Sequence, residues 1–512
     1  MNRPNVLVFM TDQQRGVTVD PDHRLKAVTP HLDRFAQRAT SFTRAHTVAP
    51  HCCPSRTSFF TGRYPSEHGV WNNVNVPNAL SRGPRDGTHF WSEDFADAGY
   101  RLGFSGKWHV SNSAGPATYG WDELVLTAGP RGTGTLDEQY VAARDQQLAG
   151  LRRADPSDID GKRGPGEVLR PGWPAFRLYG TDEDPFGDRE VVDHAVARTH
   201  DSGRTDGDDP WMLYVGTLGP HDPYVPPQRF LDLYDPESLE LPASFADPMT
   251  DKPALYRRTR DRFDQLTEDE HRAALHHYLA FCSYQDELFG RLLTALEETG
   301  QAEDTIVVYL SDHGDYTGEH GLWTKGLPSF TPAYHVPLLM HVPGTTDRPR
   351  TTDAPVSLVD LGPTLAELCN VAAPPMSGRS LVADLTGDGP DDPRDLVFQS
   401  NGNEVYGIQR TLLTDRWKLV VNLFDEDELY DLATDPDEMV NLIARESGPR
   451  TVGREPLATV PAEHREVLTA LYRRLWRFSL DHADEVLNPY IFTALATVGP
   501  LDAVAEVNAA DR

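Results

Sequence analysis

Residues 51–63 of the chain read HCCPSRTSFFTGR, with two adjacent cysteines followed by a proline. Proline suits the first turn of a helix, so this stretch predicts a helix that starts near Pro54 with Cys52 and Cys53 just ahead of it. The positive end of the helix dipole would then lie close to both thiols. The other two of the four cysteines do not complete a disulfide framework.

Three short apolar runs each end in polar residues, a pattern typical of buried strands that lead into functional loops. A helical stretch with leucines on one face, His276–Thr299, precedes the third run and ends at Gly300. This alternation predicts an α/β protein whose sheet is covered by helices on both faces, with ligand sites at the carboxyl ends of the strands. The three runs are Val6–Met10, Trp211–Leu218 and Ile306–Leu310.

Composition divides the chain into two expected parts. Residues 1–390 are expected to form the catalytic domain, in which the Gly-, Pro-, Asp- and Arg-rich stretch 112–210 forms surface insertions around the mouth of the site. A linker-like stretch at 386–393 leads into residues 391–512, a smaller C-terminal α+β subdomain. The apolar tail from Asn488 onward is a candidate contact for a homo-oligomer. The elements expected in the C-terminal part are antiparallel strands at Tyr406–Arg410 and Trp417–Asn422, the stretch Glu428–Leu432, and a final helix near Ala462–Leu480.

The chain has 512 residues, a formal net charge of -30 and a pI of about 4.9. That charge repels phosphate backbones and argues against nucleic-acid binding, so an anionic substrate requires a local positive site. Lysine is scarce among the basic residues, which gives each retained lysine, such as Lys107 and Lys325, a special interest. No apolar run reaches transmembrane length and no charged leader precedes the first strand, so we expect no membrane partner and a cytoplasmic location.

The order Cys-x-Pro-Ser-Arg followed by Thr-Gly-Arg resembles the active-site motif of the formylglycine-dependent sulfatase family, in the alkaline phosphatase superfamily. In that family a formylglycine-generating enzyme oxidises the cysteine to formylglycine, an aldehyde whose hydrate is the nucleophile. The resemblance implies that Cys52 is the modified residue and that Cys53 occupies the variable position.

Further motifs match the family in their order along the chain, so the resemblance covers nearly all of it. It implies an alkaline-phosphatase-like fold, in which helices sandwich a large central β-sheet and a smaller C-terminal subdomain carries an antiparallel sheet. The matching motifs are Gly106–His109, Gly219–Tyr224 and Gly318–Lys325.

The resemblance also implies a site for one divalent metal, with Asp12, Gln13, Cys52, Asp312 and His313 as ligands. Gln13 departs from the more common Asp-Asp pair, and His313 replaces the frequent Asn. Because both changes remove hard anionic oxygen and add nitrogen, Mn²⁺ competes with Ca²⁺ or Mg²⁺. The same pairing resembles the branch that holds phosphonate monoester hydrolases and choline sulfatases. A carboxylate at a strand tip, taken singly, is equally well read as a helix N-cap.

The resemblance assigns roles to five further polar residues. Arg56, Lys107 and Lys325 would join the metal in neutralising the charge of the ester. His109 is assigned to the formylglycine hydrate, whereas His221 and Lys325 would donate a proton to the leaving oxygen. These residue types suit covalent catalysis that needs both a base and an acid.

Two residues are candidates for substrate binding. Asn73 would bind a substrate oxygen, with a turn residue as the alternative interpretation, and His335 stands where many sulfatases carry arginine. The expected reaction is hydrolysis of a small anionic sulfate monoester to inorganic sulfate and an alcohol. The alternatives are a phosphonate monoester hydrolase or phosphodiesterase that uses the same site, and a non-catalytic binding protein. The organic part of the substrate (aryl, alkyl, choline or sugar) stays open.

Overall fold

The computed structural model describes residues 3–76, 78–128, 163–170, 173–202, 209–346, 348–387, 389, 394–403, 405–444, 460–487 and 496–500. Eight strands form the central sheet, in the order β11-β2-β10-β9-β1-β8-β4-β5. In its middle β9, β1, β8 and β4 are parallel neighbours, whereas β10 is antiparallel to both β9 and β2. The strand bounds are β1 Asn5–Thr11, β2 Thr40–Phe42, β4 Arg101–Lys107, β5 Asp122–Thr127, β8 Trp211–Gly216, β9 Thr305–Ser311, β10 Leu338–His341 and β11 Arg350–Thr352.

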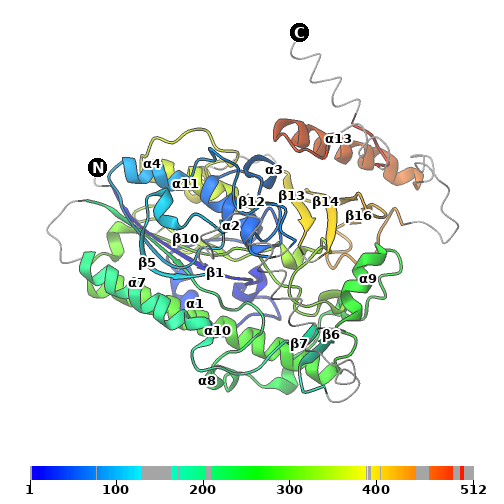
Figure 1. Ribbon diagram of the computed structural model, residues 1–512, viewed down its shortest axis with the longest axis horizontal. Helices are drawn as coiled ribbons and strands as arrows, with labels where there is room; N and C mark the ends of the chain where they lie inside the picture. The colour runs from blue at the N-terminus through cyan, green and yellow to red at the C-terminus, as the bar shows by residue number, and fades with distance from the viewer. Residues whose placement is uncertain are drawn as a thin grey trace, which may run out of the picture.

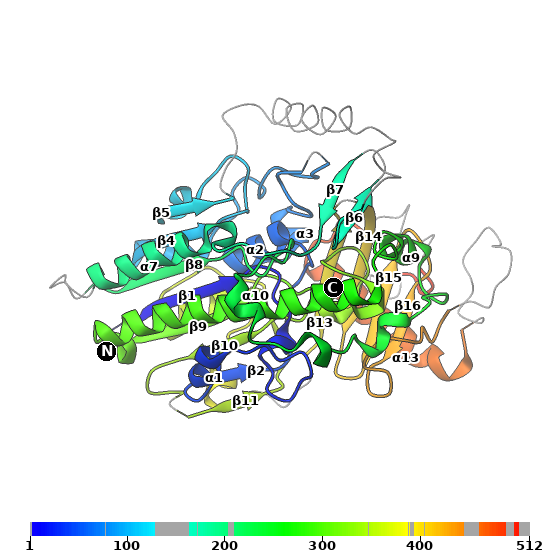
Figure 2. The ribbon, with the colours of Figure 1, turned by 90° about the horizontal axis from the view of Figure 1, so that it is seen from below.

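Helices cover both faces of this sheet, as the sequence predicts (Figures 1 and 2). The upper face in Figure 1 is covered by α2 (Cys52–Thr61), α4 (Trp91–Asp97) and α11 (Leu361–Leu368). The opposite face is covered by α1 (Pro30–Ala36), α7 (Asp188–Ser202), α8 (Gln228–Leu231) and α10 (Glu268–Glu298).

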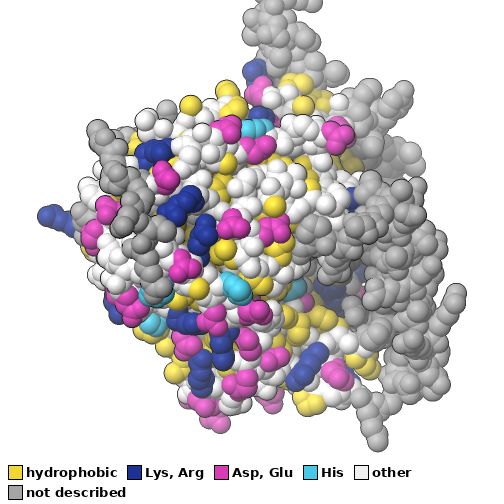
Figure 3. All heavy atoms as spheres, turned by 60° about the vertical axis from the view of Figure 1, so that its left-hand side comes forward, with side chains coloured by type: hydrophobic (Ala, Val, Ile, Leu, Met, Phe, Trp, Pro, Cys, Tyr) yellow, Lys and Arg dark blue, Asp and Glu magenta, His cyan; other side chains and the backbone are white. Residues whose placement is uncertain are grey.

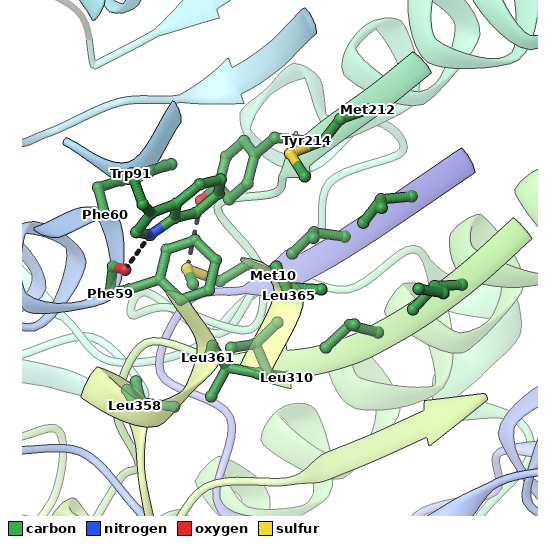
Figure 4. Packing of buried hydrophobic residues seen from close by; sticks show 14 of the residues in the cluster. Met10, Phe59, Phe60, Trp91, Met212, Tyr214, Leu310, Leu358, Leu361 and Leu365 are labelled. Atoms are coloured by element: carbon green, nitrogen blue, oxygen red, sulfur yellow. Dashed lines mark hydrogen bonds between the residues drawn. The ribbon is translucent and has the colours of Figure 1, made fainter. Parts of the chain in front are cut away.

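The side chains of β1 alternate between two apolar cores. Val6, Val8 and Met10 pack on the α2 side of the sheet, and Leu7 and Phe9 pack on the α10 side. Successive residues of a strand point to opposite faces, so a strand buried on both faces reads as one continuous apolar run. Figure 4 shows part of the first core, where residues of three strands meet α2 and α11. Those labelled there include Met10, Met212, Tyr214, Leu310, Phe59, Phe60, Leu361 and Leu365.

Two expectations about helices need correction. The helix expected at His276–Thr299 is the second part of α10, which begins eight residues earlier because Thr267 and Glu270 form a capping box. The stretch expected to form surface insertions contains α7, whose Val191 and Val192 are buried against the sheet. Much of the remainder of that stretch, residues 129–162, lies outside the described residues.

The C-terminal part carries the expected antiparallel sheet, in the order β13-β14-β15-β16. Helix α13 (Arg465–Asp481) covers one of its faces and closes a third apolar core. The boundary near residue 390 stays a prediction, and most of the tail from Asn488 lies outside the described residues. The strand bounds are β13 Leu396–Gly402, β14 Tyr406–Leu413, β15 Trp417–Asn422 and β16 Glu428–Asp431.

Shorter elements surround these two sheets. Two small pairings add to them, β3 with β12 and β6 with β7. Among the described helices, none is long and apolar enough to cross a membrane. On the face shown in Figure 3, acidic and basic side chains are interspersed and form no single block of either sign. The short elements are β3 Ala45–His46, β6 Glu167–Arg170, β7 Trp173–Arg177, β12 Val356–Ser357, α3 Pro65–His68, α9 Ala254–Asp261 and α12 Val382–Thr386.

Candidate active site

The carboxyl ends of four adjacent parallel strands bring the predicted polar residues to one edge of the sheet. Asp12 follows β1, Asp312 follows β9, and His221 follows β8. Lys107 is the last residue of β4, where Gly106 has a φ of 104° and a Cβ would overlap the carbonyl oxygen of Gly216. Glycine therefore lets β4 turn beside β8 at this point. This edge is where ligands bind in open α/β sheets.

Four side chains form a compact buried group. One ligand atom from each of Asp12, Cys52, Asp312 and His313 lies within 4.8 Å of those of the others. The Sγ of Cys52 lies 3.3 Å from Nε2 of His313 and 3.8 Å from Oδ1 of Asp12. The other ring nitrogen of His313 lies 2.9 Å from the carbonyl oxygen of Gly314, which leaves Nε2 directed into the group.

This donor set fits a divalent cation. Two carboxylates and an imidazole nitrogen converge on one point, and all of them are fully buried. Buried carboxylates this close repel each other unless positive charge lies between or beside them. Carboxylate oxygen and imidazole nitrogen suit Mn²⁺ as well as the harder Ca²⁺ and Mg²⁺.

Arg56 lies behind the two carboxylates and donates to both of them. Its Nε donates to Oδ2 of Asp312 at 2.8 Å and an Nη donates to Oδ2 of Asp12 at 3.0 Å. The other Nη donates to Tyr214 Oη and to the carbonyl oxygen of Lys107. With a partner for every nitrogen and no exposed surface, the guanidinium positions the carboxylates, and its role in neutralising the charge of the ester stays a prediction.

The two adjacent cysteines have opposite electrostatic surroundings. Burial opposes ionisation of both, and it raises the pKa of Cys53 far above its usual range. At Cys52, the charges of Lys107, Lys325 and His313 outweigh burial and hold the pKa well below its usual range. Cys52 is the first residue of α2, two positions before the predicted start, so the positive end of that helix lies at its side chain.

Gln13 connects the carboxylates of Asp222 and Asp315 with a lysine. Its Nε2 donates to Oδ2 of Asp315 at 2.6 Å and to Oδ1 of Asp222 at 3.0 Å. Its Oε1 accepts a hydrogen bond from Nζ of Lys325. Because two carboxylates can accept only from the amide nitrogen, the oxygen must face the lysine. The assignment of Gln13 as a metal ligand stays a prediction.

His221 and Lys325 form a pair beside the nucleophile candidate. Nε2 of His221 lies 2.7 Å from Nζ of Lys325, and its Nδ1 lies 2.5 Å from the carbonyl oxygen of Asp222. A ring nitrogen beside an ammonium acts as the acceptor, so Lys325 donates to His221. The pair thus places one exchangeable proton between a lysine and a histidine.

His109 and Lys107 lie on the β4 side of the group. Nζ of Lys107 donates to Oδ2 of Asp12, and the ring of His109 contacts Asn75 Oδ1 through Nε2 at 2.9 Å. Burial, with the nearby Lys107, lowers the pKa of His109 to about 4, so the ring is neutral at pH 7. The ring lies beside the thiol of Cys52, whose ionisation it favours, so the neutral imidazole can accept a proton there.

A cavity of about 510 Å³ opens onto these residues, and His109, His221 and Lys325 all line it. Asn73 also lines it, although its Oδ1 accepts from the backbone N–H of Cys53 at 3.1 Å. His335 is not part of the cavity wall. Its Nε2 contacts the carbonyl oxygen of Thr43 at 2.9 Å, so the structure does not bring His335 together with the other candidates.

Sequence reasoning missed several polar residues of the site. His51 caps α2 and lines the cavity, and burial lowers its pKa to about 3. Its signal was its place next to Cys52. Asp222 directly follows His221 inside the motif Gly219–Tyr224, and Asp315 lies two residues after the candidate ligand His313. Asn75 had no signal beyond its nearness to Asn73 in the chain.

Comparisons with known proteins agree with this geometry. The sulfatase family model matches residues 4–371, and the model for the C-terminal part of N-sulphoglucosamine sulphohydrolase matches residues 318–453. A choline-sulfatase of Rhizobium meliloti is 29% identical, with 87% of this chain and 84% of that protein covered. An arylsulfatase of Clostridium perfringens is 26% identical, over 87% of this chain and 91% of that protein.

Solved structures show the same fold. The phosphonate monoester hydrolase from Silicibacter pomeroyi superimposes with a TM-score of 0.71 at 23% identity, over 95% of this chain and 97% of that one. The corresponding enzyme of Agrobacterium radiobacter also gives 0.71, at 21% identity and the same coverage. The expected alkaline-phosphatase-like fold is therefore confirmed. Because a family model matches well over half of its residues, the chain belongs to the sulfatase family.

Proposed function

We propose that this sulfatase hydrolyses sulfate monoesters through a formylglycine made from Cys52 and one divalent metal held by Asp12, Asp312, His313 and residue 52. The observation that carries the proposal is the convergence of these four side chains, within 4.8 Å, at the carboxyl edge of the sheet. Bound there, a divalent cation would supply positive charge for the sulfate oxygens and for the attacking oxygen.

The residues around position 52 suit both the attack on sulfur and the later release of sulfate. The hydrate of formylglycine carries two hydroxyls, one of which attacks sulfur while the bond from sulfur to the leaving oxygen breaks. His221 and Lys325 lie together on one side and would give the leaving oxygen its proton. His109, neutral and beside residue 52, would take the proton of the second hydroxyl as sulfate is expelled and the aldehyde returns.

Maturation and metal identity are part of the proposal. We infer a formylglycine-generating enzyme as a partner, because a thiol becomes an aldehyde only by oxidation and Cys52 is buried at the site. We infer Mn²⁺ or Ca²⁺ as the metal, because the donor set includes an imidazole beside two carboxylates.

The test is an assay of purified enzyme that has been co-expressed with a formylglycine-generating enzyme. Its kcat/KM would be measured with sulfate monoesters, phosphonate monoesters and phosphodiesters. The proposal predicts the highest kcat/KM for a sulfate monoester, and its loss in Cys52→Ala. A phosphonate or phosphodiester preferred over every sulfate would favour the alternative reaction at the same site.

A further inference from the structure

The described wall of the active-site cavity is rich in cationic side chains, although the chain has a net charge of -30. Among the described residues that line it are three cationic side chains, Lys325, Arg258 and Arg262, and one carboxylate, Asp222. That carboxylate is already engaged, because it accepts from Gln13 at 3.0 Å and lies 3.5 Å from Nδ1 of His221. Among the described lining residues, positive side chains therefore outnumber carboxylates, which favours the entry of an anion.

The cations nearest the nucleophile have partners of their own. Lys107 and Arg56 are bound to the carboxylates of the metal group, and Lys325 is bound to His221 and Gln13. The charges that act most strongly on Cys52 are those of Lys107, Lys325 and His313, and neither Arg258 nor Arg262 is among them. The two arginines thus add positive charge farther from the reacting sulfur.

Both arginines come from one face of α9 and its carboxyl end. Leu255, Arg258, Thr259 and Arg262 all line the cavity, at the i, i+3, i+4 and i+7 spacing of one helix face. Arg258 and Arg262 are four residues apart, so their side chains are neighbours. Helix α9 lies beside the C-terminal sheet (Figures 1 and 2), where Tyr256 Oη donates to Glu428 and fixes the helix.

The two arginines are held differently. Arg262 lies near the inner part of the cavity, since its charge is one of those that lower the pKa of Asp222. Arg258 is exposed and makes no hydrogen bond or ion pair with any residue that the structure describes. A guanidinium left without a carboxylate partner beside an active site is suited to a carboxylate or sulfate of a ligand.

The rest of the wall does not suit a cation. Val76, Leu327 and Val405 provide apolar surface, and no described lining residue is Phe, Tyr or Trp. A quaternary ammonium group is usually bound by aromatic faces or by free carboxylates. The described wall of this cavity has no Phe, Tyr or Trp face, and its one carboxylate is already engaged, even though one relative is a choline-sulfatase.

We propose that Arg258 and Arg262 form a subsite for a second anionic group, a carboxylate or a second sulfate, on the organic part of the substrate. The inference rests on the proposed function, because the first sulfate must bind at residue 52. The preferred substrates are then organic sulfates that carry another acid, with an apolar segment between the two groups against Val405 and Leu327.

The test uses three aryl sulfates that differ only at the far end of the ring. These are 4-(sulfooxy)phenylacetate, its neutral amide, and 4-(trimethylammoniomethyl)phenyl sulfate, in which a methylene separates the charge from the ring. For the enzyme matured with a formylglycine-generating enzyme, we expect kcat/KM to favour the carboxylate over the amide by about tenfold or more, the scale of one charge-assisted hydrogen bond. The ammonium compound should be the poorest of the three.

Substitutions test whether the two arginines cause the preference for the carboxylate over the amide. Arg258→Gln combined with Arg262→Gln should bring the ratio of carboxylate to amide close to one, and Arg258→Glu should favour the ammonium compound. Arg272→Gln is the matched control, since this arginine pairs with Glu268 on the exposed side of α10 and should leave the ratio unchanged.

The outcomes separate the two proposals. A ratio near one in the unsubstituted enzyme, or a high ratio that survives loss of both arginines, overturns the second anionic subsite while sulfate hydrolysis stands. If the matured enzyme hydrolyses phosphonates and none of the three sulfates, the proposed function itself is wrong, and the subsite proposal falls with it.

Discussion

Nζ of Lys325 lies 2.7 Å from Nε2 of His221, although 103 residues of chain separate them. The lysine also donates to Gln13, which follows β1, so the pair links the loops after β1 and β8 to the motif that ends at Lys325. Such a pair stores a proton next to the place where the leaving oxygen must take one.

Removal of either member should therefore make the reaction more sensitive to the leaving group. In Lys325→Ala and His221→Ala we expect kcat/KM for alkyl sulfates to fall by about 10²–10⁴, the usual contribution of general acid catalysis, and to fall less for activated aryl sulfates. The measurement is the slope of log kcat/KM against phenol pKa in a series of aryl sulfates. If the slopes of both variants match that of the unsubstituted enzyme, the pair acts through charge alone.

Arg56 should matter for stability as much as for activity. Its replacement in Arg56→Met leaves two buried carboxylates without their clamp, which costs about 3–5 kcal/mol for a broken buried ion pair. Thermal unfolding of the metal-free protein would show the loss. Arg56→Lys keeps the charge but loses the planar group that bonds both carboxylates. Its unfolding temperature should lie between those of the unsubstituted protein and Arg56→Met. Equal unfolding temperatures for all three proteins would show that Arg56 does not stabilise the two carboxylates.

Metal dependence follows from the four-residue group. Asp312→Ala removes a proposed ligand. It should lower kcat/KM by an amount that corresponds to at least several kcal/mol of transition-state stabilisation. It should also lower the content of bound metal, as measured by elemental analysis. Chelation of the unsubstituted enzyme should abolish activity, and Mn²⁺ should restore it at least as well as Ca²⁺. Full activity after complete removal of metal would disprove the assignment.

A buried glutamate predicts a pH dependence of stability away from the active site. Burial raises the pKa of Glu428 to about 7, against hydrogen bonds from Tyr430, Asn422 and Tyr256 that lower it. The folded state therefore keeps a proton between about pH 4.5 and 7 that the unfolded chain has released, and stability falls as pH rises through that window. The effect is on the order of 3 kcal/mol.

Glu428→Gln tests this directly, because the amide stays neutral and the tyrosine hydroxyls can turn to accept. The variant should lose the fall in unfolding free energy between pH 5 and 7 and be the more stable protein at pH 8. Parallel curves for the two proteins would show that Glu428 does not titrate in this window.

The sequence predicted the edge of the sheet where the site lies, because apolar runs that stop at Asp12 and Asp312 mark strand ends. It also selected Cys52 from two adjacent cysteines through the spacing to Pro54 and Arg56. The side chains assigned from motifs, other than His335, do meet at that edge or line the cavity. For His335 the motif gave the position in the chain, whereas packing against Gly16 and Thr43 decides where the ring lies.

The contribution of α9 could not be predicted in the same way. Arg258 and Arg262 look like an ordinary charged helix face, and tertiary contacts such as the hydrogen bond from Tyr256 to Glu428 place that face at the cavity. Contacts between residues so far apart in the chain leave no local periodicity to detect. The same holds for Gln13, whose two carboxylate partners follow other strands.

The most direct test of the account is mass spectrometry of the peptide that contains Cys52 and Cys53, from enzyme co-expressed with a formylglycine-generating enzyme. We predict the aldehyde mass at residue 52 and an unmodified thiol at residue 53, with activity retained in Cys53→Ala and lost in Cys52→Ala. An aldehyde at residue 53, or full activity in Cys52→Ala, would contradict the central claim.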